Sequence, residues 1–271
     1  MKNYRILGIV LILIVTLALS LTLRSLNQEK NNLSENDDNN VKADDETSEE
    51  PEEDLEDLRL IMEQQARKYP ETFYLAAPDT EKRIALTFDD GPDELNTPVI
   101  LDILAEKNVK ATFFLLGENV KLFPEITKRI HDEGHQIGNH SWSHDNFREL
   151  ENEQVLNKEI LPTSEKIEEI TGLYPRLLRP PFGAINDETI ETLGEKNWQI
   201  VNWSIDSYDW HISRDNPDEI VNRMKRLHHP GGIVLLHNNF QSRVTTEALA
   251  DIIETLKEKG YQFNTIAELL Y

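Results

Sequence analysis

Two adjacent carboxylates end an apolar, strand-like stretch of this 271-residue chain. Residues 83–92 read RIALTFDDGP, in which β-prone residues lead to Asp89 and Asp90, and Gly91-Pro92 ends the strand. Successive side chains of a regular strand point to opposite faces, so both carboxylates can serve one site only where the strand gives way to a loop. The alternative is a turn whose aspartates make only local hydrogen bonds.

A pair of histidines is the second group that could do chemistry. His140 and His144 lie in the segment NHSWSH, and their i, i+4 spacing puts two imidazoles on one side of a helical turn, where they can bind one metal ion. Ser141 stands where a zinc-peptidase helix has its Glu, which excludes that motif. The spacing alone also fits two structural histidines. Combined with Asp89 or Asp90, it makes a two-histidine, one-carboxylate set that suits catalytic Zn²⁺ or non-haem Fe²⁺.

Three further motifs each follow an expected strand. In the segment RPPFG at 179–183, two prolines and a glycine restrict the backbone, so that the N–H of Phe182 could face a developing oxyanion, although a surface turn is the alternative. The segment WSIDSYDW at 203–210 sets aromatic residues beside carboxylates, which suits either sugar stacking or a partly buried aromatic corner. The segment LLH at 235–237 ends in His237, and such a histidine taken alone is more often structural than catalytic.

These residues need a scaffold, and from Lys82 onward strand-like and helix-like segments alternate, which predicts an α/β domain. The expected strands are 83–88, 111–116, 136–139, 177–179, 199–205, 232–236 and 262–265. The expected helices between them are 97–107, 124–133, 153–171, 187–196, 217–227 and 246–259. Seven parallel strands with six helices predict a distorted, incomplete (β/α) barrel. Every motif above lies at the carboxyl end of a strand, where such folds have their sites.

The amino-terminal part of the chain has a different composition. Residues 6–23 carry no charge and follow Lys2 and Arg5, and 18 such residues reach the minimum for a membrane-spanning helix. We expect residues 1–26 to be an uncleaved signal anchor in the cell membrane, with the catalytic domain outside; secretion after signal cleavage is the alternative. Residues 27–57 are expected to be a disordered acidic linker, residues 58–271 the catalytic domain, and residues 55–69 a short helix.

Composition narrows the partners and the metal ligands. The chain has no cysteine, so His, Asp and Glu must supply any metal ligands. A net charge of −22 argues against a nucleic-acid partner, because the phosphate backbone requires a basic surface. The remaining histidines are expected to be structural or exposed, and His135, just before the third strand, to support the metal loop.

Together, the five motifs resemble the ordered motifs of the polysaccharide deacetylase family, also called the NodB-homology domain or carbohydrate esterase family 4. The resemblance covers residues 80–271 and implies a distorted (β/α) barrel that removes acetyl groups from chitin-like oligomers, peptidoglycan or xylan. It implies that Asp90, His140 and His144 bind one divalent metal ion, Zn²⁺ in the first place, with Co²⁺ or Fe²⁺ as alternatives.

The resemblance also implies roles for the other motif residues. Asp89 would be the general base, oriented by Arg179, and His237 the general acid, oriented by Asp209. Four residues would contact the substrate, with the last two lining the pocket for the acetyl methyl group: Pro181, Phe182, Trp210 and Leu235. Phe182 departs from the family pattern, since several members have Tyr there, and the change could alter sugar contacts.

An exported domain that acts on acetylated sugars most simply acts on the cell's own wall. We therefore expect metal-dependent deacetylation of peptidoglycan N-acetylglucosamine by a monomer. The alternatives are a chitooligosaccharide or acetylxylan deacetylase and, in a different class, a catalytically inactive carbohydrate-binding module.

Overall fold

The computed structural model describes residues 52–78, 81–211 and 216–271. Leu55–Tyr271 form one unit, and the fold below is that unit's. The expected anchor, 1–26, and the acidic linker up to residue 51 lie outside the described residues, whereas residues 52–57 begin the first described helix. No helix in the described ranges is long and apolar enough to cross a bilayer.

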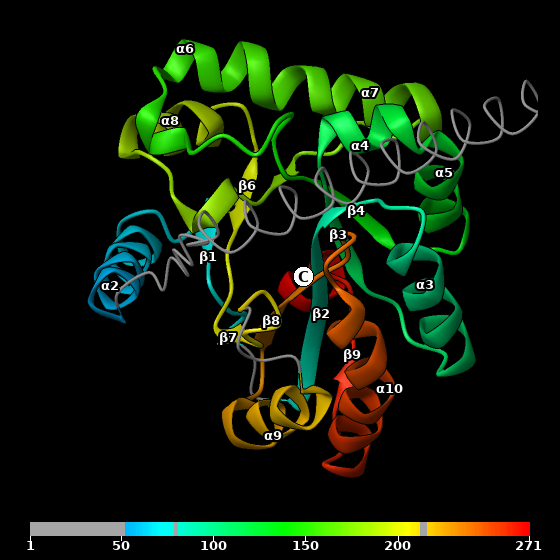
Figure 1. Ribbon diagram of the computed structural model, residues 1–271. Helices are drawn as coiled ribbons and strands as arrows, with labels where there is room; N and C mark the ends of the chain where they lie inside the picture. The colour runs from blue at the N-terminus through cyan, green and yellow to red at the C-terminus, as the bar shows by residue number, and fades with distance from the viewer. Residues whose placement is uncertain (1–51, 79–80, 212–215) are drawn as a thin grey trace, which may run out of the picture. The chain divides into compact units, whose positions relative to one another are not determined.

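Nine strands among the described residues form one sheet, and all their pairings are parallel. They are β1 (Phe73–Tyr74), β2 (Arg83–Gly91), β3 (Thr112–Leu115), β4 (Gln136–Asn139), β5 (Leu177–Leu178), β6 (Gln199–Val201), β7 (Ile205–Asp206), β8 (Gly232–His237) and β9 (Gln262–Phe263). The spatial order is β1-β6-β5-β4-β3-β2-β8-β7, and β9 pairs with the first residues of β2 (Figure 1).

The sheet is curled, as the sequence predicts for an incomplete barrel. β6 and β7 lie near opposite ends of the strand order, yet only three residues separate them in the chain. Within this short connection the backbone changes partners: the Asn202 N–H donates to Tyr74 O at 2.9 Å, and the Ser204 N–H donates to Ile233 O at 3.2 Å. The expected single strand at 199–205 is therefore two strands. The two-residue strand β1 was not predicted, because so short a segment has no recognisable alternation.

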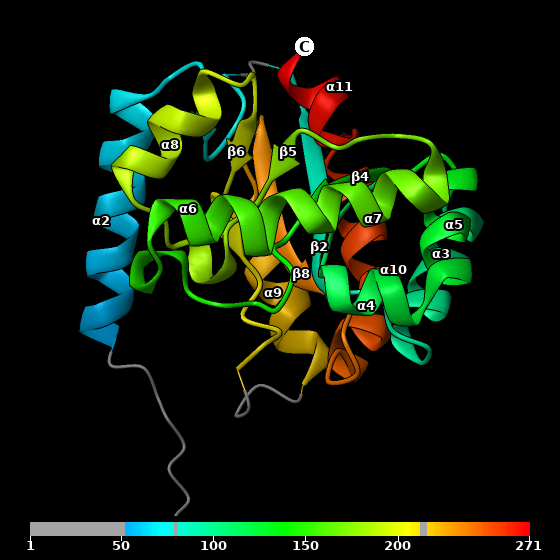
Figure 2. The same cartoon turned by 90° about the horizontal axis from the view of Figure 1, so that it is seen from above.

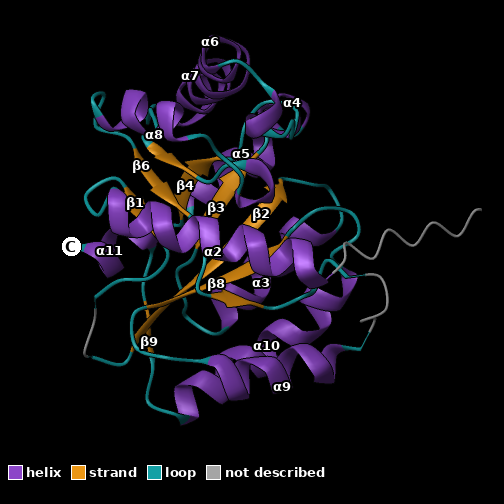
Figure 3. Cartoon of the chain, turned by 90° about the vertical axis from the view of Figure 1, so that its left-hand side faces the viewer, coloured by secondary structure: helices purple, strands orange, loops and turns teal. Residues whose placement is uncertain are grey.

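Helices surround the strands (Figure 2). They are α2 (Glu52–Lys68), α3 (Asn96–Glu106), α4 (Gly117–Leu122), α5 (Pro124–Asp132), α6 (Asn152–Gln154), α7 (Leu161–Thr171), α8 (Asp187–Gly194), α9 (Pro217–Leu227), α10 (Arg243–Glu258) and α11 (Ile266–Leu270). The expected helix at 153–171 is instead α6, a π-helical turn at Val155–Ile160 and α7. Helices α9 and α10 pack side by side (Figure 3).

The alternation of side chains along β2 separates the core from the site. Ile84, Leu86 and Phe88 are fully buried in a cluster beneath the surrounding helices, whereas Ala85 belongs to a second cluster. This second cluster includes Ile266 of α11, whose N–H donates to the first residue of β3, at the amino ends of the strands. Residues 87 and 89 share the face of Ala85, so the inner face is apolar at one end and polar at the carboxyl end.

Candidate active site

A β-bulge brings the two adjacent carboxylates to one place. Strand β2 continues to Gly91, three residues beyond the predicted end, and its register with β3 shifts between Phe88 and Gly91. Asp90 has a φ of 72°, in the left-handed region. As a result, Asp89 Oδ2 lies 3.8 Å and Asp90 Oδ1 3.3 Å from the same atom, Nε2 of His140. The expected loss of alternation at this point is confirmed.

The segment that carries His140 and His144 is a loop, so the predicted helical turn is wrong. Ser141 and His144 have φ values of 79° and 69°, which a right-handed helix does not allow. Side chains hold the loop instead: the Ser141 N–H donates to Asn139 Oδ1 at 2.8 Å, and the His144 N–H donates to Ser141 Oγ at 2.9 Å. The N–H groups of Trp142 and Ser143 donate to Glu159 Oε2, at 2.9 and 3.0 Å. Glu159 lies in the π-helical turn.

Asp90, His140 and His144 form a cluster that can hold a metal ion. Asp90 Oδ1 lies 3.3 Å from His140 Nε2 and 3.2 Å from His144 Nε2. That carboxylate oxygen is buried and has no hydrogen-bond partner, which fits a site for a cation. His140 Nδ1 lies 2.8 Å from Arg179 O, to which it can donate, leaving the Nε2 lone pair free for a metal. Although burial raises the pKa of Asp90, the two imidazoles outweigh it and hold this pKa well below its usual value.

Asp89 is paired with a fully buried arginine. The Asp89 side chain is on the inner face, and the residue is only 2% exposed. Arg179 Nη1 donates to Asp89 Oδ1 at 2.8 Å and to Thr87 Oγ1 at 2.7 Å. Its other nitrogens donate to main-chain carbonyls, Nε to Val201 O and Nη2 to Asn202 O. These contacts fix the guanidinium, so a positive charge stays directly beside the Asp89 carboxylate.

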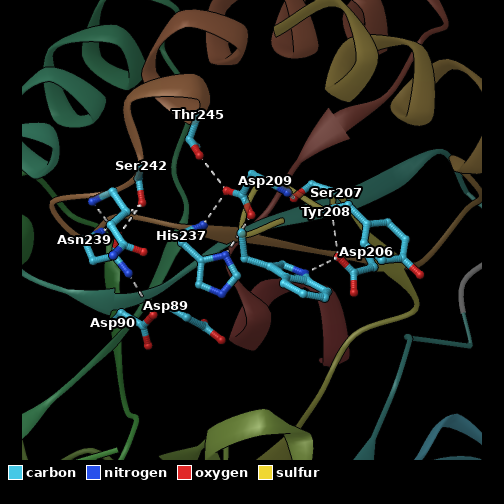
Figure 4. Close-up of polar contacts among 12 residues, drawn as sticks. Asp89, Asp90, Asp206, Ser207, Tyr208, Asp209, His237, Asn239, Ser242 and Thr245 are labelled. Carbon is cyan, nitrogen blue, oxygen red and sulfur yellow. Dashed lines mark hydrogen bonds and ion pairs between the residues drawn. The ribbon is translucent and has the colours of Figure 1, made fainter. Parts of the chain in front are cut away.

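His237 stands opposite Asp89 in the sheet and has its own carboxylate partner. The register of β2 and β8 pairs Asp89 with His237. His237 Nδ1 lies 2.7 Å from Asp209 Oδ1, while Thr245 Oγ1 donates to Asp209 Oδ2 at 2.5 Å (Figure 4). Burial favours the neutral imidazole, but the charge of Asp209 and this hydrogen bond outweigh it and raise the pKa of His237 to about 10. The ring is therefore a proton donor at neutral pH.

The four predicted substrate-contacting residues occupy different environments. Pro181 is buried and starts a 3₁₀ turn in which Phe182 has a φ of 58°. The Phe182 side chain is 51% exposed, and its ring meets His144 edge-on, with 4.7 Å between centroids. Trp210 is 39% exposed and donates from Nε1 to Asp206 Oδ1 at 3.2 Å. Leu235 is 3% exposed and lies two residues before His237, on the same face of β8. Their contacts with a substrate remain a prediction.

Three polar residues that hold the site were missed by sequence reasoning. Glu159 fastens the histidine loop, Thr245 contacts Asp209, and Asn239 Nδ2 donates to Asp90 Oδ2 at 3.0 Å. None of them lies inside one of the five motifs. Asn239 follows His237 by two residues, so its place directly after β8 was the one available signal.

Two of the remaining histidines make structural hydrogen bonds, as expected, whereas the structure contradicts the role expected of His135. His228 Nδ1 lies 3.0 Å from the Tyr261 hydroxyl, and His229 Nε2 lies 2.9 Å from Ser204 Oγ. His135 directly precedes β4, at the opposite end of that strand from His140, and its Nδ1 accepts from the Ala111 N–H at 3.2 Å. The expectation that it supports the metal loop is therefore wrong.

Comparisons with known proteins agree with the site. The model of the family described as polysaccharide deacetylase matches residues 76–201. The chain is 42% identical to a peptidoglycan-N-acetylglucosamine deacetylase of Bacillus cereus over 74% of this chain and 72% of that one. It is 38% identical to a peptidoglycan-N-acetylmuramic acid deacetylase of Bacillus subtilis over 74% of this chain and 76% of that one.

Solved structures are similar over the same part of the chain. The Bc1960 peptidoglycan N-acetylglucosamine deacetylase has a TM-score of 0.70 and 40% identity, over 73% of this chain and 92% of that one. A CE4 family pseudoenzyme from Bacillus anthracis has a TM-score of 0.69 and 35% identity, over 74% of this chain and 69% of that one. Fold, motif order and sequence identity agree with the resemblance noted from the sequence, and this chain belongs to the polysaccharide deacetylase family, carbohydrate esterase family 4.

Proposed function

We propose that this protein is a Zn²⁺-dependent deacetylase that hydrolyses the acetamido group of N-acetylglucosamine in peptidoglycan. One observation carries the proposal: Asp89 and His237 are neighbours on adjacent strands at the inner face, beside the Asp90–His140–His144 cluster. Asp89 has a buried cation as its partner and His237 a buried anion. A carboxylate and an imidazolium beside a metal site can supply the base, the acid and the Lewis acid for hydrolysis of an amide.

We assign the proton transfers to Asp89 and His237. Asp89, whose Oδ1 accepts from Arg179 Nη1, takes a proton from the water that attacks the acetyl carbonyl carbon. His237, held in its protonated form by Asp209, donates a proton to the sugar nitrogen as the carbon–nitrogen bond breaks. The products are acetate and the free amino sugar. The N–H of Phe182 would donate to the oxyanion that forms in between.

Asp90, His140 and His144 would hold the metal ion. When bound, Zn²⁺ supplies Lewis acidity toward the carbonyl and makes water easier to deprotonate. The hydrogen-bonding distance between His140 Nδ1 and Arg179 O supports this assignment, since it fixes one ring with Nε2 facing the cluster. The exposed Phe182 and Trp210 would contact the sugar rings.

The choice of N-acetylglucosamine rests on similarity. A relative that bears the name peptidoglycan-N-acetylglucosamine deacetylase is 42% identical to this chain, against 38% for one named for N-acetylmuramic acid. The uncharged segment 6–23 favours a catalytic domain outside the cell, held by residues 1–26 at the membrane or secreted after cleavage. A wall polysaccharide is then the accessible substrate, ahead of chitooligosaccharides and acetylated xylan.

An inactive carbohydrate-binding module is the second candidate, because one similar structure is a pseudoenzyme. The residues favour activity. A module that only binds sugar has no need for Arg179 buried against Asp89, nor for Asp209 buried against His237, since burying charges in pairs costs free energy.

Acetate release tests the proposal. The full-length protein in mild detergent is incubated with peptidoglycan, chitooligosaccharides and acetylated xylan, with chelator and with added Zn²⁺, and chemically deacetylated samples serve as blanks. Acid hydrolysis of the treated peptidoglycan then distinguishes new glucosamine from new muramic acid. We expect chelator-sensitive release that yields glucosamine. Muramic acid, or release from another glycan alone, would reassign the substrate. No release by folded, metal-loaded protein would favour the binding module.

A further inference from the structure

We propose that Asn239 is a positioning residue for the metal site, which holds the Asp90 carboxylate so that a single oxygen faces the two imidazoles. The inference rests on the proposed function, because it requires a metal ion at Asp90, His140 and His144. Asn239 lies outside the five motifs, on the segment between β8 and α10 (Figure 4).

The two oxygens of Asp90 have different surroundings. Oδ1 is buried, has no hydrogen-bond partner and lies 3.2 and 3.3 Å from the imidazole nitrogens. Oδ2 instead accepts from Asn239 Nδ2 at 3.0 Å. This hydrogen bond uses one of the lone pairs of Oδ2 and holds the carboxylate with Oδ1 directed at the two imidazoles. This arrangement favours monodentate ligation and leaves coordination positions for water and substrate.

The orientation of the Asn239 amide follows from its other contacts. Its Oδ1 accepts from the Gln241 N–H at 2.9 Å and from Ser242 Oγ at 3.1 Å. A main-chain N–H can only donate, so the atom facing Gln241 must be the amide oxygen. The NH₂ group therefore faces Asp90.

The backbone of Asn239 is also held in place. Its N–H donates to Ser242 Oγ at 3.1 Å, and its carbonyl oxygen accepts from Asn96 Nδ2 at 2.7 Å. The preceding residue continues the link to β2, because the Asn238 N–H donates to Asp89 O and Asn238 Oδ1 accepts from the Gly91 N–H, each at 3.0 Å. These contacts fix the backbone of Asn239 beside the bulge, so that its side-chain amide is held within reach of Asp90.

An amide is suited to this task because it donates without adding charge. A lysine in its place would compete with the metal ion for the carboxylate, whereas a neutral donor orients the carboxylate and leaves its charge for the cation. Removal of the donor frees the carboxylate to rotate and to present both oxygens. We expect Asn239→Ala to weaken Zn²⁺ binding about 10–100-fold, the usual effect of losing such a partner, and to lower kcat when the site is saturated with metal.

The test measures Zn²⁺ affinity of the metal-free, full-length protein by competition with a chromogenic chelator, beside kcat and KM for acetate release. Asn239→Ser is the second variant: its hydroxyl can still accept from the Gln241 N–H and preserve the turn, but it is too short to reach Asp90. Gln241→Ala is a control that removes an exposed side-chain amide two residues from Asn239. Asn96→Ala is a control that removes the hydrogen bond to the Asn239 carbonyl oxygen and leaves Asp90 untouched.

The expected result is weaker Zn²⁺ binding in both Asn239 variants and wild-type affinity in both controls. If Asn239→Ser restores what Asn239→Ala loses, or if Asn96→Ala weakens binding equally, the residue serves only the loop and the inference is wrong. Unchanged affinity in Asn239→Ala refutes it as well. If Asn239→Ala does not fold, the same comparison is made with Asn239→Ser. Wild-type protein that binds no Zn²⁺ would instead refute the metal site of the proposed function, and the inference with it.

Discussion

The substitution Asp209→Asn tests whether a buried carboxylate keeps His237 protonated. Asparagine preserves the size of the side chain and a hydrogen-bonding group, but it removes the negative charge 2.7 Å from His237 Nδ1. Burial is the largest single influence on the pKa of His237 and lowers it, and Asp209 is the largest influence that raises it. Without the charge of Asp209, burial still lowers this pKa, whereas Asp89 and Asp90 still raise it. Because these influences oppose each other, we take the ordinary value of 6.5 as the reference for the variant.

The expected effect follows from the two pKa values. With a pKa of about 10, about 99% of His237 carries the catalytic proton at pH 8. With a pKa of 6.5, about 3% carries it, which is a loss of about 30-fold in the acid form. At pH 6 about three quarters of the variant molecules still carry this proton, so the loss of the acid form is less than about twofold. The defect must therefore grow as the pH rises.

Two measurements follow this change. An NMR titration of the His237 ring in metal-free protein, assigned with His237→Gln, reports the pKa directly. The pH profile of kcat/KM for acetate release reports it in the loaded enzyme, where the variants are compared with one another because the metal ion adds its own charge. Thr245→Val is the matched control, since it removes a hydrogen bond to Asp209 and leaves the charge. A ring in Asp209→Asn that still titrates near 10, or an equal loss at pH 6 and pH 8, would refute the reasoning.

Four other substitutions test the rest of the site. Asp89→Asn should lower the rate of acetate release about 10²–10⁴-fold and keep its Zn²⁺ content, whereas His140→Ala should lose the metal. Elemental analysis measures the metal content, and equal metal loss in both variants would overturn the separate roles of Asp89 and Asp90. Arg179→Met leaves the Asp89 carboxylate buried without its partner and should lower the free energy of unfolding about 3–5 kcal/mol in urea, and a loss below about 1 kcal/mol would contradict the pairing. Gly117→Ala places a Cβ 2.3 Å from Cε3 of Trp142, a residue that lies between the two histidines in the sequence. The clash should lower the free energy of unfolding by about 1–3 kcal/mol and weaken Zn²⁺ binding. An unchanged urea midpoint would count against this prediction.

The sequence located much of the site because its chemistry depends on local order. A strand that ends in two carboxylates, a histidine pair and a strand that ends in His237 were all readable as motifs after strands, and parallel strands bring their carboxyl ends to one edge. The strand at 136–139 and the helix at 217–227 were predicted to the residue, since turn signals or Asn-Pro mark their ends. The order of motifs along the chain was enough to indicate the family.

Other features depend on contacts between distant segments, and only the tertiary structure decided them. The i, i+4 histidines look helical in sequence, but Glu159 and Ser141 hold a loop there with two left-handed residues. Asp90 turns toward His140 because the register with β3 shifts, which no pattern within β2 encodes. Asn239 reaches Asp90 across 149 positions of the chain.

The amino-acid sequence by itself therefore indicated the carboxylates, histidines and arginine of the five motifs, because residue type and the alternation of strands and helices are local properties. The fold decided how those groups are aimed, through a bulge, a hydrogen-bonded loop and a curled sheet whose strands β6 and β7 are three residues apart. Each of these is the result of pairing between segments far apart in the chain. Hydrogen bonds of that kind form only when the whole sheet is assembled, and so the direction of a side chain such as Asp90 is a tertiary property.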